Sequence, residues 1–137
     1  MNEIPPNFKP LTTDKFQWPQ SITRYLISQD EQFLEKVRHH IVRNLANEHF
    51  SVQDLADNIH LSVSQLNRKL NKLIGQSAGK LILEIRLRHA AGLLESNVAS
   101  IGDIAYRCGF RDQAYFCRRF KKQFNCTPST FRRRAAR

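Results

Sequence analysis

Two short stretches of the chain concentrate side chains that could form hydrogen bonds with the base edges and phosphates of nucleic acid. They run from Ser64 to Lys72 and from Gln113 to Lys122, and neither contains an acidic residue. Gln, Asn and Arg can each make paired hydrogen bonds to the edge of adenine or guanine, and Lys and Arg neutralise phosphates. An exposed face that served solubility alone would normally carry Glu as well, so both stretches indicate an anionic partner.

Each stretch predicts a helix with one apolar side and one polar side. The polar side lies opposite Leu66 and Leu70 in the first stretch, and opposite Phe116 and Phe120 in the second. Contacts with bases are predicted for Ser64, Gln65, Asn67, Arg68, Gln113, Ala114, Cys117 and Arg118. Contacts with phosphates are predicted for Lys69, Asn71, Lys72, Arg119, Lys121, Lys122 and Arg132.

The elements that must position these side chains are predicted to be helices. Apolar residues recur with helical spacing from Phe33 onwards, and no segment sustains the alternation typical of a strand, so the fold class is all-α with about seven helices. Residues suited to helix starts stand before these apolar runs, namely Asp30, Ser51, Ser62, Ser77, Ser100, Asp112 and Thr127. Gly75 and Asn125 are predicted to end helices in the left-handed conformation.

The sequence contains an internal repeat of one structural unit. Ser51–Leu61 aligns with Ser100–Phe110 at an offset of 49 residues, and Ser62–Ile82 aligns with Asp112–Arg132 at an offset of 50. Each unit predicts a short helix, a tight turn and a second helix, which is the helix-turn-helix pattern. Ala56 and Ala105 are expected where the two helices cross closely, and His60 and Gly109 are expected to take positive φ in the turns.

The composition of the chain favours nucleic acid as a partner and argues against a membrane. The chain has 22 Lys and Arg against 12 Asp and Glu, for a formal net charge of +10, which favours nucleic acid first. Cys108, Cys117 and Cys126 fit neither a disulfide framework nor a zinc site, so we expect a cytoplasmic protein without a metal or other cofactor. No stretch approaches the roughly 20 apolar residues of a membrane span, and no signal-peptide pattern begins the chain, so no membrane partner is expected.

Three alternatives compete with sequence-specific binding of DNA. A non-specific architectural module that binds nucleic acid would show the same positive charge. An enzyme could use Cys117 as a nucleophile with His39, His40 or His89 as a base, but nothing in the spacing brings any such pair together, so no catalytic residue is predicted. A membrane-surface helix is disfavoured because no basic face also carries aromatic residues that the core leaves free.

The second unit carries an extended motif. It comprises Ile101, Asp103, Ile104, Ala105, Cys108, Gly109 and Phe110, then Asp112, Tyr115, Phe116, Phe120, Lys121 and Lys122, then Thr127, Pro128, Phe131 and Arg132. This motif resembles the C-terminal signature of the AraC/XylS family of transcription regulators. The first unit adds Leu55-Ala56, Leu61–Leu70 and Gly75-Gln76-Ser77, and Arg86–Leu94 is similar to the linker helix of the family. Ala78 and Asn125 replace the Pro and Gly that are usual at these positions, and both are physically conservative.

The resemblance implies an organisation and a set of partners. Residues 30–137 are expected to form an AraC-type DNA-binding domain, and residues 1–29 an N-terminal linker or arm, because four of the five prolines fall in the first nineteen residues. Within this domain, the first helix-turn-helix covers about 51–75, the linker helix about 77–96 and the second helix-turn-helix about 100–125. The expected partner is double-stranded DNA, with the two second helices in successive major grooves. An upstream sensor or receiver domain is a further expected partner, since Asp30–Leu34 and Gly75–Ser77 are similar to hybrid two-component sensor-regulators of bacteria. RNA polymerase and a dimer on DNA are also expected.

Overall fold

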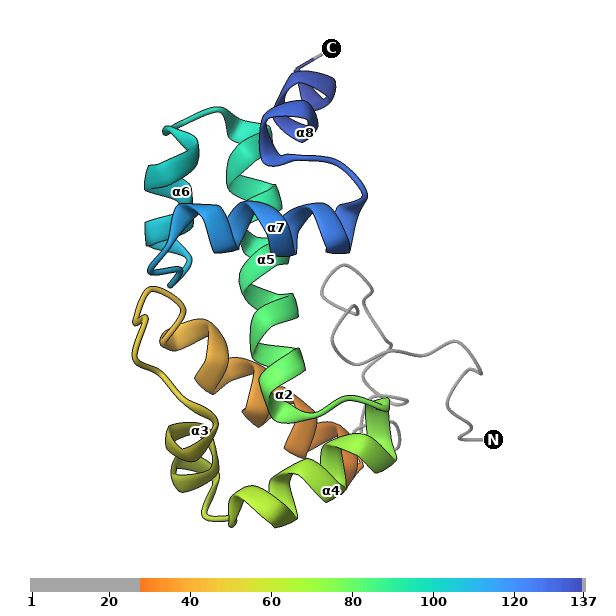
Figure 1. Ribbon diagram of the computed structural model, residues 1–137. Helices are drawn as coiled ribbons and strands as arrows, with labels where there is room; N and C mark the ends of the chain where they lie inside the picture. Colours follow the sequence, from red (N-terminus) through yellow and green to blue (C-terminus); the bar gives the residue numbers. More distant parts are fainter. Residues whose placement is uncertain (1–27, 137) are drawn as a thin grey trace, which may run out of the picture. The chain divides into compact units, whose positions relative to one another are not determined.

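The computed structural model describes residues 28–136, and these residues form seven α-helices and no strand (Figure 1). The predicted all-α class is therefore confirmed. The helices are α2 (Gln29–Arg43), α3 (Val52–Ile59), α4 (Val63–Ile74), α5 (Ala78–Ser96), α6 (Ile101–Arg107), α7 (Gln113–Phe124) and α8 (Pro128–Ala135). Two compact units divide the chain after His40, so α2 begins in the first unit and ends in the second. Most of the expected arm, residues 1–29, lies outside the described residues.

The start of α2 differs from the expectation that Asp30 caps it. Ser28 stands at the cap, where its hydroxyl oxygen accepts a hydrogen bond from the backbone nitrogen of Glu31 at 3.2 Å. The backbone nitrogen of Ser28 in turn donates to the Glu31 carboxylate at 2.7 Å, which completes a capping box. Asp30 and Glu31 lie in the first turn, where their charges favour the helix dipole.

The turns of the two helix-turn-helix units are built alike. Leu61 N donates to Ala56 O at 3.0 Å, and Phe110 N donates to Ala105 O at 2.9 Å, which is the six-residue closure of a Schellman motif in both cases. His60 and Gly109 take the left-handed conformation within these turns, with φ values of 64° and 85°. Each of these pairs is separated by 49 residues, so the predicted internal repeat is confirmed in the backbone.

The second helices of the two units match in length and in both ends. α4 and α7 each contain 12 residues and start 50 positions apart. Ser62 and Asp112 cap their starts, and Gly75 and Asn125 end them with φ values of 69° and 63°. The offset changes from 49 to 50 between the two turns because the second turn contains one extra residue, Arg111.

α5 connects the two helix-turn-helix units. It contains 19 residues, starts at the Ser77 cap and ends at Asn97 in the left-handed conformation. Figure 1 shows α3 and α4 at one end of this helix, and α6, α7 and α8 at the other. At about 1.5 Å per residue, a helix of this length spans about 28 Å.

The core of the second helix-turn-helix forms where α5 packs against α6, α7 and α8. Phe116 and Phe120 are fully buried in it, with ring centroids 5.6 Å apart. Leu45, which precedes the first helix-turn-helix in the chain, belongs to the same core cluster. Ala56 and Ala105 are both buried, with 0% and 1% of their surfaces exposed, as expected for positions of close helix crossing.

Candidate nucleic-acid interface

α4 presents a polar face that is exposed over its whole length. Ser64, Gln65, Arg68, Asn71 and Lys72 are exposed, whereas the opposite side of the helix is buried in the core. Gln65 completes a capping box, because its side-chain oxygen accepts a hydrogen bond from Ser62 N at 2.9 Å. The amide NH₂ group of Gln65 keeps its two donors for another partner.

α7 presents the corresponding face in the second unit. Gln113, Ala114, Arg118, Lys121 and Lys122 are exposed, and Phe116 and Phe120 fill the opposite side. The phenylalanines therefore fix the rotation of α7 about its axis and turn the cations outwards. The same rotation is set in α4 by Leu66 and Leu70, which stand at the matching positions.

The sequence interpretation did not single out Tyr115 as a site residue. It is 41% exposed, and the guanidinium carbon of Arg118 lies 5.7 Å from the centroid of its ring. Such an arrangement is a cation–π contact, which restrains Arg118 on the surface of α7. The repeat could have indicated Tyr115, because it stands 50 positions after Gln65 and so occupies the matching position on the second helix.

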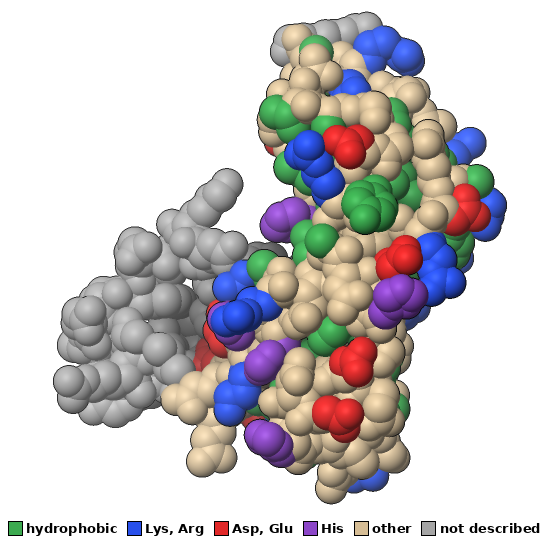
Figure 2. All heavy atoms as spheres, turned by 90° about the vertical axis from the view of Figure 1, so that its left-hand side faces the viewer, with side chains coloured by type: hydrophobic (Ala, Val, Ile, Leu, Met, Phe, Trp, Pro, Cys, Tyr) green, Lys and Arg blue, Asp and Glu red, His purple; other side chains and the backbone are tan. Residues whose placement is uncertain are grey.

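The charges on these two faces are not compensated by nearby carboxylates. Within the described part of the chain, Arg68, Lys72, Arg118, Lys121 and Lys122 form no ion pair. Acidic residues lie elsewhere, for example Asp54 on α3 and Asp103 on α6. Figure 2 looks onto the side of Figure 1 on which α3 and α6 lie, and shows acidic side chains among basic ones there. An uncompensated cluster of cations is an attractive surface for a polyanion.

Asn67 has a role that was not predicted. Its side-chain oxygen accepts a hydrogen bond from Ala78 N at 2.8 Å, and Ala78 is fully buried at the first position of α5. The first nitrogens of a helix lack partners within the helix, so Asn67 supplies one of them from α4. The residue therefore joins α4 to α5, and its acceptor is already engaged.

Cys117 and Arg119 lie partly inside the second unit. Cys117 packs against the core cluster, and burial raises the pKa of its thiol. The Arg119 side chain is half-buried, and its Nε atom has no hydrogen-bond partner among the described residues. Both residues thus border the exposed face of α7 without lying at its centre.

Arg132 is engaged within the protein. Its guanidinium donates a hydrogen bond to the backbone carbonyl of Ala99, in the connection between α5 and α6. Arg132 stands on α8, which packs against α5, so the bond fastens α8 to this connection. The contact explains the position of Arg132 without an external phosphate.

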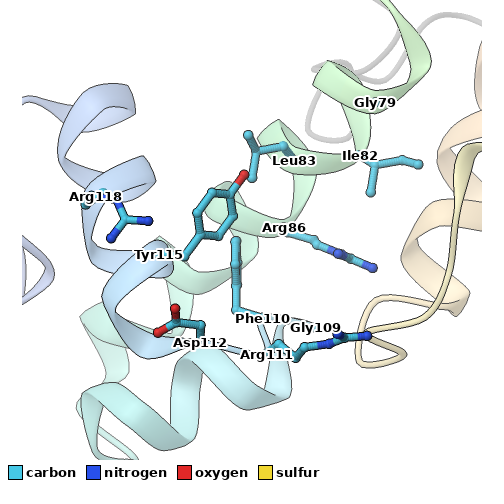
Figure 3. A pocket seen from close by; sticks show the side chains of 10 residues that line it. All are labelled: Gly79, Ile82, Leu83, Arg86, Gly109, Phe110, Arg111, Asp112, Tyr115 and Arg118. Atoms are coloured by element: carbon cyan, nitrogen blue, oxygen red, sulfur yellow. The ribbon is translucent and has the colours of Figure 1, made fainter.

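A cleft of about 470 Å³ adjoins the face of α7 (Figure 3). Its walls come from α5, from the α6–α7 turn and from the first half of α7, and three of its side chains are arginines: Arg86, Arg111 and Arg118. The two arginines besides Arg118 are already bonded to the connection between α2 and α3. Among the described residues, Arg118 on α7 is the arginine of the cleft that forms neither a hydrogen bond nor an ion pair with the α2–α3 connection.

The described residues form neither a metal site nor a membrane span. Among residues 28–136, no group of three or more His, Cys, Asp or Glu side chains is placed to hold a metal ion. None of the helices in this part of the chain has the length and apolar character needed to cross a bilayer.

Comparison with known proteins identifies the class to which this arrangement belongs. The profile of the family described as "Helix-turn-helix domain" matches residues 55–134. The chain is 38% identical over 116 residues to "Histidine kinase P4" of Formosa agariphila, a match that covers 85% of the chain and 8% of that protein. It is 36% identical over 93 residues to the "Urease operon transcriptional activator" of Escherichia coli, covering 68% of the chain and 31% of the activator.

A solved structure gives the same result. The DNA-binding domain of AdpA, described as a global transcriptional factor and solved in complex with a target DNA, superimposes with a TM-score of 0.67. That match has 27% identity and covers 72% of this chain and 88% of the other. The chain belongs to the AraC-type helix-turn-helix family of DNA-binding transcription regulators. It spans less than a third of the length of the two curated relatives named above.

Proposed function

We propose that this chain reads a bipartite site in double-stranded DNA by placing α4 and α7 in successive major grooves. The observation that carries the proposal is the matched pair of acid-free 12-residue helices, each with an exposed arginine at the same position, Arg68 and Arg118. Helices with this pattern fit the width of the major groove, and arginine there pairs with guanine. The length of α5, about 28 Å, is close to the separation of successive major grooves, about 34 Å, and modest bending of DNA can supply the difference.

The proposed division of labour follows the exposure of each side chain. Base readout is assigned to the first half of each helix, to Ser64, Gln65 and Arg68 in α4 and to Gln113, Ala114 and Arg118 in α7. Phosphate contacts are assigned to Lys69, Asn71, Lys72, Arg119, Lys121 and Lys122. We assign Asn67 and Arg132 to contacts within the protein in place of DNA contacts, because each is half-buried and bonded to a backbone group of another segment, whereas Gln65 is exposed. Cys117 stays a base-contact candidate of limited reach, because it is half-buried.

The chain is proposed to act as the output part of a larger bacterial regulator in the cytoplasm. Residues 30–137 are the proposed DNA-binding domain, and residues 1–29 its connection to preceding segments. An upstream sensor or receiver domain is the proposed source of the signal, because the similar histidine kinase is more than ten times longer than the match. Contact with RNA polymerase and dimerisation on DNA belong to the same proposal.

Catalysis is not part of the proposal. Burial raises the pKa of the Cys117 thiol, so the thiolate that a nucleophile requires is disfavoured at neutral pH. The family to which the chain belongs consists of DNA-binding regulators. The histidine kinase match involves a small part of that protein and carries no kinase activity over to this chain.

Selection of bound duplexes from a random DNA pool tests the function directly. We expect the chain to enrich a motif with two half-sites about one helical turn apart. Its binding to that motif should survive an excess of random duplex at moderate salt, since specific complexes are typically about 10³-fold or more tighter than non-specific ones. Enrichment of no motif, with complete displacement by random duplex, would support the non-specific architectural alternative instead.

A further inference from the structure

We infer that Arg86, together with the connection between α2 and α3, locks the two helix-turn-helix units at one separation and thereby fixes the spacing of the half-sites that the chain accepts. This inference rests on the proposed function, because it concerns how the two recognition helices are positioned. It makes Arg86 a positioning residue that touches no DNA. The contacts that carry it all lie in the second compact unit, residues 41–137.

The first contact is a close approach at Gly109, in the turn between α6 and α7. A Cβ atom at this position would overlap the carbonyl oxygen of Leu45 and would lie 2.9 Å from Arg86 Nε. Only a residue without a side chain lets the α2–α3 connection come this near to the second turn. The side chain of Leu45 is inserted in the same region, because it belongs to the core cluster that contains Phe110.

The second contact is made by Arg86 itself, near the middle of α5. Its NH2 group donates a hydrogen bond to the carbonyl oxygen of Asn47 at 2.9 Å. Desolvation by burial lowers the pKa of its guanidinium, which remains charged at any physiological pH. Arg86 is thus half-buried between the α2–α3 connection on one side and the second turn on the other.

The third contact uses the residue that distinguishes the second turn from the first. Arg111 is the extra residue, and its NH2 group lies 3.3 Å from His49 Nδ1 while its Nε lies 3.8 Å from a Glu48 carboxylate oxygen. Figure 3 shows Arg86 and Arg111 extending toward the same side of the cleft. The insertion in the repeat therefore provides a second bond to the same connection.

The α2–α3 connection, residues 44–51, is closed by hydrogen bonds of its own, and we call this connection together with Arg86 the brace. Asn47 N donates to Asn44 O at 3.0 Å, and Phe50 N donates to Asn47 O at 3.1 Å, so its backbone is closed into successive turns. Its two large apolar side chains, Leu45 and Phe50, are buried. A carbonyl in such a segment is a fixed acceptor, and Asn47 O receives both Phe50 N and Arg86.

The brace has a consequence for recognition because without it α5 would be the connection between the two helix-turn-helix units. One added base pair moves the second half-site by about 3.4 Å and rotates it by about 35° around the duplex. Units joined through α5 alone could follow part of that displacement by bending of the helix, whereas units also held by Arg86 and the α2–α3 connection cannot. The chain should therefore tolerate only one spacing.

The test measures affinity for the duplex that the chain itself selects, and for the same duplex with one base pair added or removed between the half-sites. We expect the wild-type chain to lose about tenfold or more on either change, because the two helices can no longer bind together. Arg86→Met keeps the packing of the stem and removes the bond to Asn47. It should retain its affinity for a single half-site and lose much less on the change of spacing.

Two glycines provide a matched control that separates the brace from backbone strain. Gly109 and Gly75 both have positive φ, at 85° and 69°, but a Cβ at Gly75 would meet nothing within 4 Å. Ala at either position introduces the left-handed strain, and only Gly109→Ala also pushes against Leu45 and Arg86. We expect Gly109→Ala to flatten or shift the spacing profile, and Gly75→Ala to leave it sharp.

A measurement without DNA distinguishes failure of the brace from failure of the proposed function. Spin labels attached to cysteines at two exposed positions, Gln53→Cys on α3 and Gln123→Cys on α7, report the separation of the units. The variants Cys117→Ser and Cys126→Ser remove the other accessible thiols, since Cys108 is buried. The wild-type background should give a narrow distance distribution, and Arg86→Met or Arg111→Ala a broader one. Arg111 is exposed, so its variant remains informative if Arg86→Met does not fold.

The two measurements distinguish failure of this inference from failure of the proposed function. A spacing profile and a distance distribution as sharp in the folded Arg86→Met, Arg111→Ala and Gly109→Ala variants as in the wild type would overturn the inference. If the wild-type chain selects no bipartite duplex, the proposed function fails, and the spin-label distances still decide whether the brace exists. Broadened distances and a flattened spacing profile, with half-site affinity preserved, would establish both.

Discussion

The side-chain oxygen of Asn67 accepts a hydrogen bond from the backbone nitrogen of Ala78 at 2.8 Å, so α4 is fastened directly to the first turn of α5. Asn67→Leu should lower the free energy of unfolding by about 1–3 kcal/mol, because a buried backbone N–H would lose its partner. Asn67→Asp keeps the acceptor and should stay within about 1 kcal/mol of the wild type. Urea unfolding followed by circular dichroism measures both, and equal losses would mean that the acceptor is not what matters.

Arg68→Ala and Arg118→Ala should each weaken binding of the selected duplex by about 1–3 kcal/mol and relax base preference at one position of the corresponding half-site. Lys72→Ala and Lys122→Ala are the matched controls, because these lysines are exposed on the same helices. They should weaken binding to all duplexes alike and lower the slope of log affinity against log salt by about one each. Titrations at several salt concentrations, against both selected and random duplexes, supply the comparison. Four variants with the same behaviour would contradict the assignment of base and phosphate contacts.

Arg132→Ala is expected to act on stability and not on the salt dependence of binding. Its guanidinium is bonded to the Ala99 carbonyl, so its loss should lower the melting temperature by loosening α8. The salt slope should remain that of the wild type, in contrast to Lys122→Ala. A reduced salt slope in Arg132→Ala with an unchanged melting temperature would instead support the phosphate contact that the sequence predicts.

Ala56→Leu and Ala105→Leu should each destabilise the chain by about 1–3 kcal/mol, because added methylenes have no space at a close helix crossing. Both alanines are at most 1% exposed. Ala114→Leu makes the same substitution on the exposed side of α7 and serves as the control. Thermal melts that leave both buried variants unchanged would show that the helices do not cross closely at these alanines.

Alkaline pH should weaken the folded state through Cys108. Burial raises the pKa of its thiol from 9.0 to about 11, with the charge of Arg86 acting in the opposite direction. Below pH 9 the thiol is neutral in both states, so its contribution to stability is complete. Between pH 9 and 11 the unfolded chain ionises and the folded chain does not, so stability falls as the pH rises. Cys108→Ala should lack this part of the fall when urea unfolding is compared across that range.

Much of the fold follows from local patterns that a sequence displays. Ser51, Ser62 and Ser100 cap helices as predicted, and Gly75 and Asn125 end them in the left-handed conformation. These features depend on residues within four positions of each other, which is why spacing alone reveals them. The exposure of Arg68 and Arg118 follows in the same way from the apolar residues on the opposite sides of their helices.

Hydrogen bonds between residues far apart in the chain could not be predicted from local spacing. Asn67 and Arg132 have the composition and location of DNA-contacting residues, and only the fold brings Ala78 N and Ala99 O to them. The role of Arg86 depends on a residue 39 positions earlier in the chain, Asn47. Periodicity gives the direction of a side chain relative to its own helix and does not give the neighbour that it meets.

Leu45 precedes the first repeat in the chain and yet lies in the core of the second. A truncated chain that began at Ser77 would contain α6, α7 and α8 intact and would still lack a side chain that fills their core. Although duplication is visible in the sequence, the two repeats are not interchangeable modules that could be shuffled or excised singly. On heating, both should melt together in one calorimetric peak whose van't Hoff and calorimetric enthalpies agree.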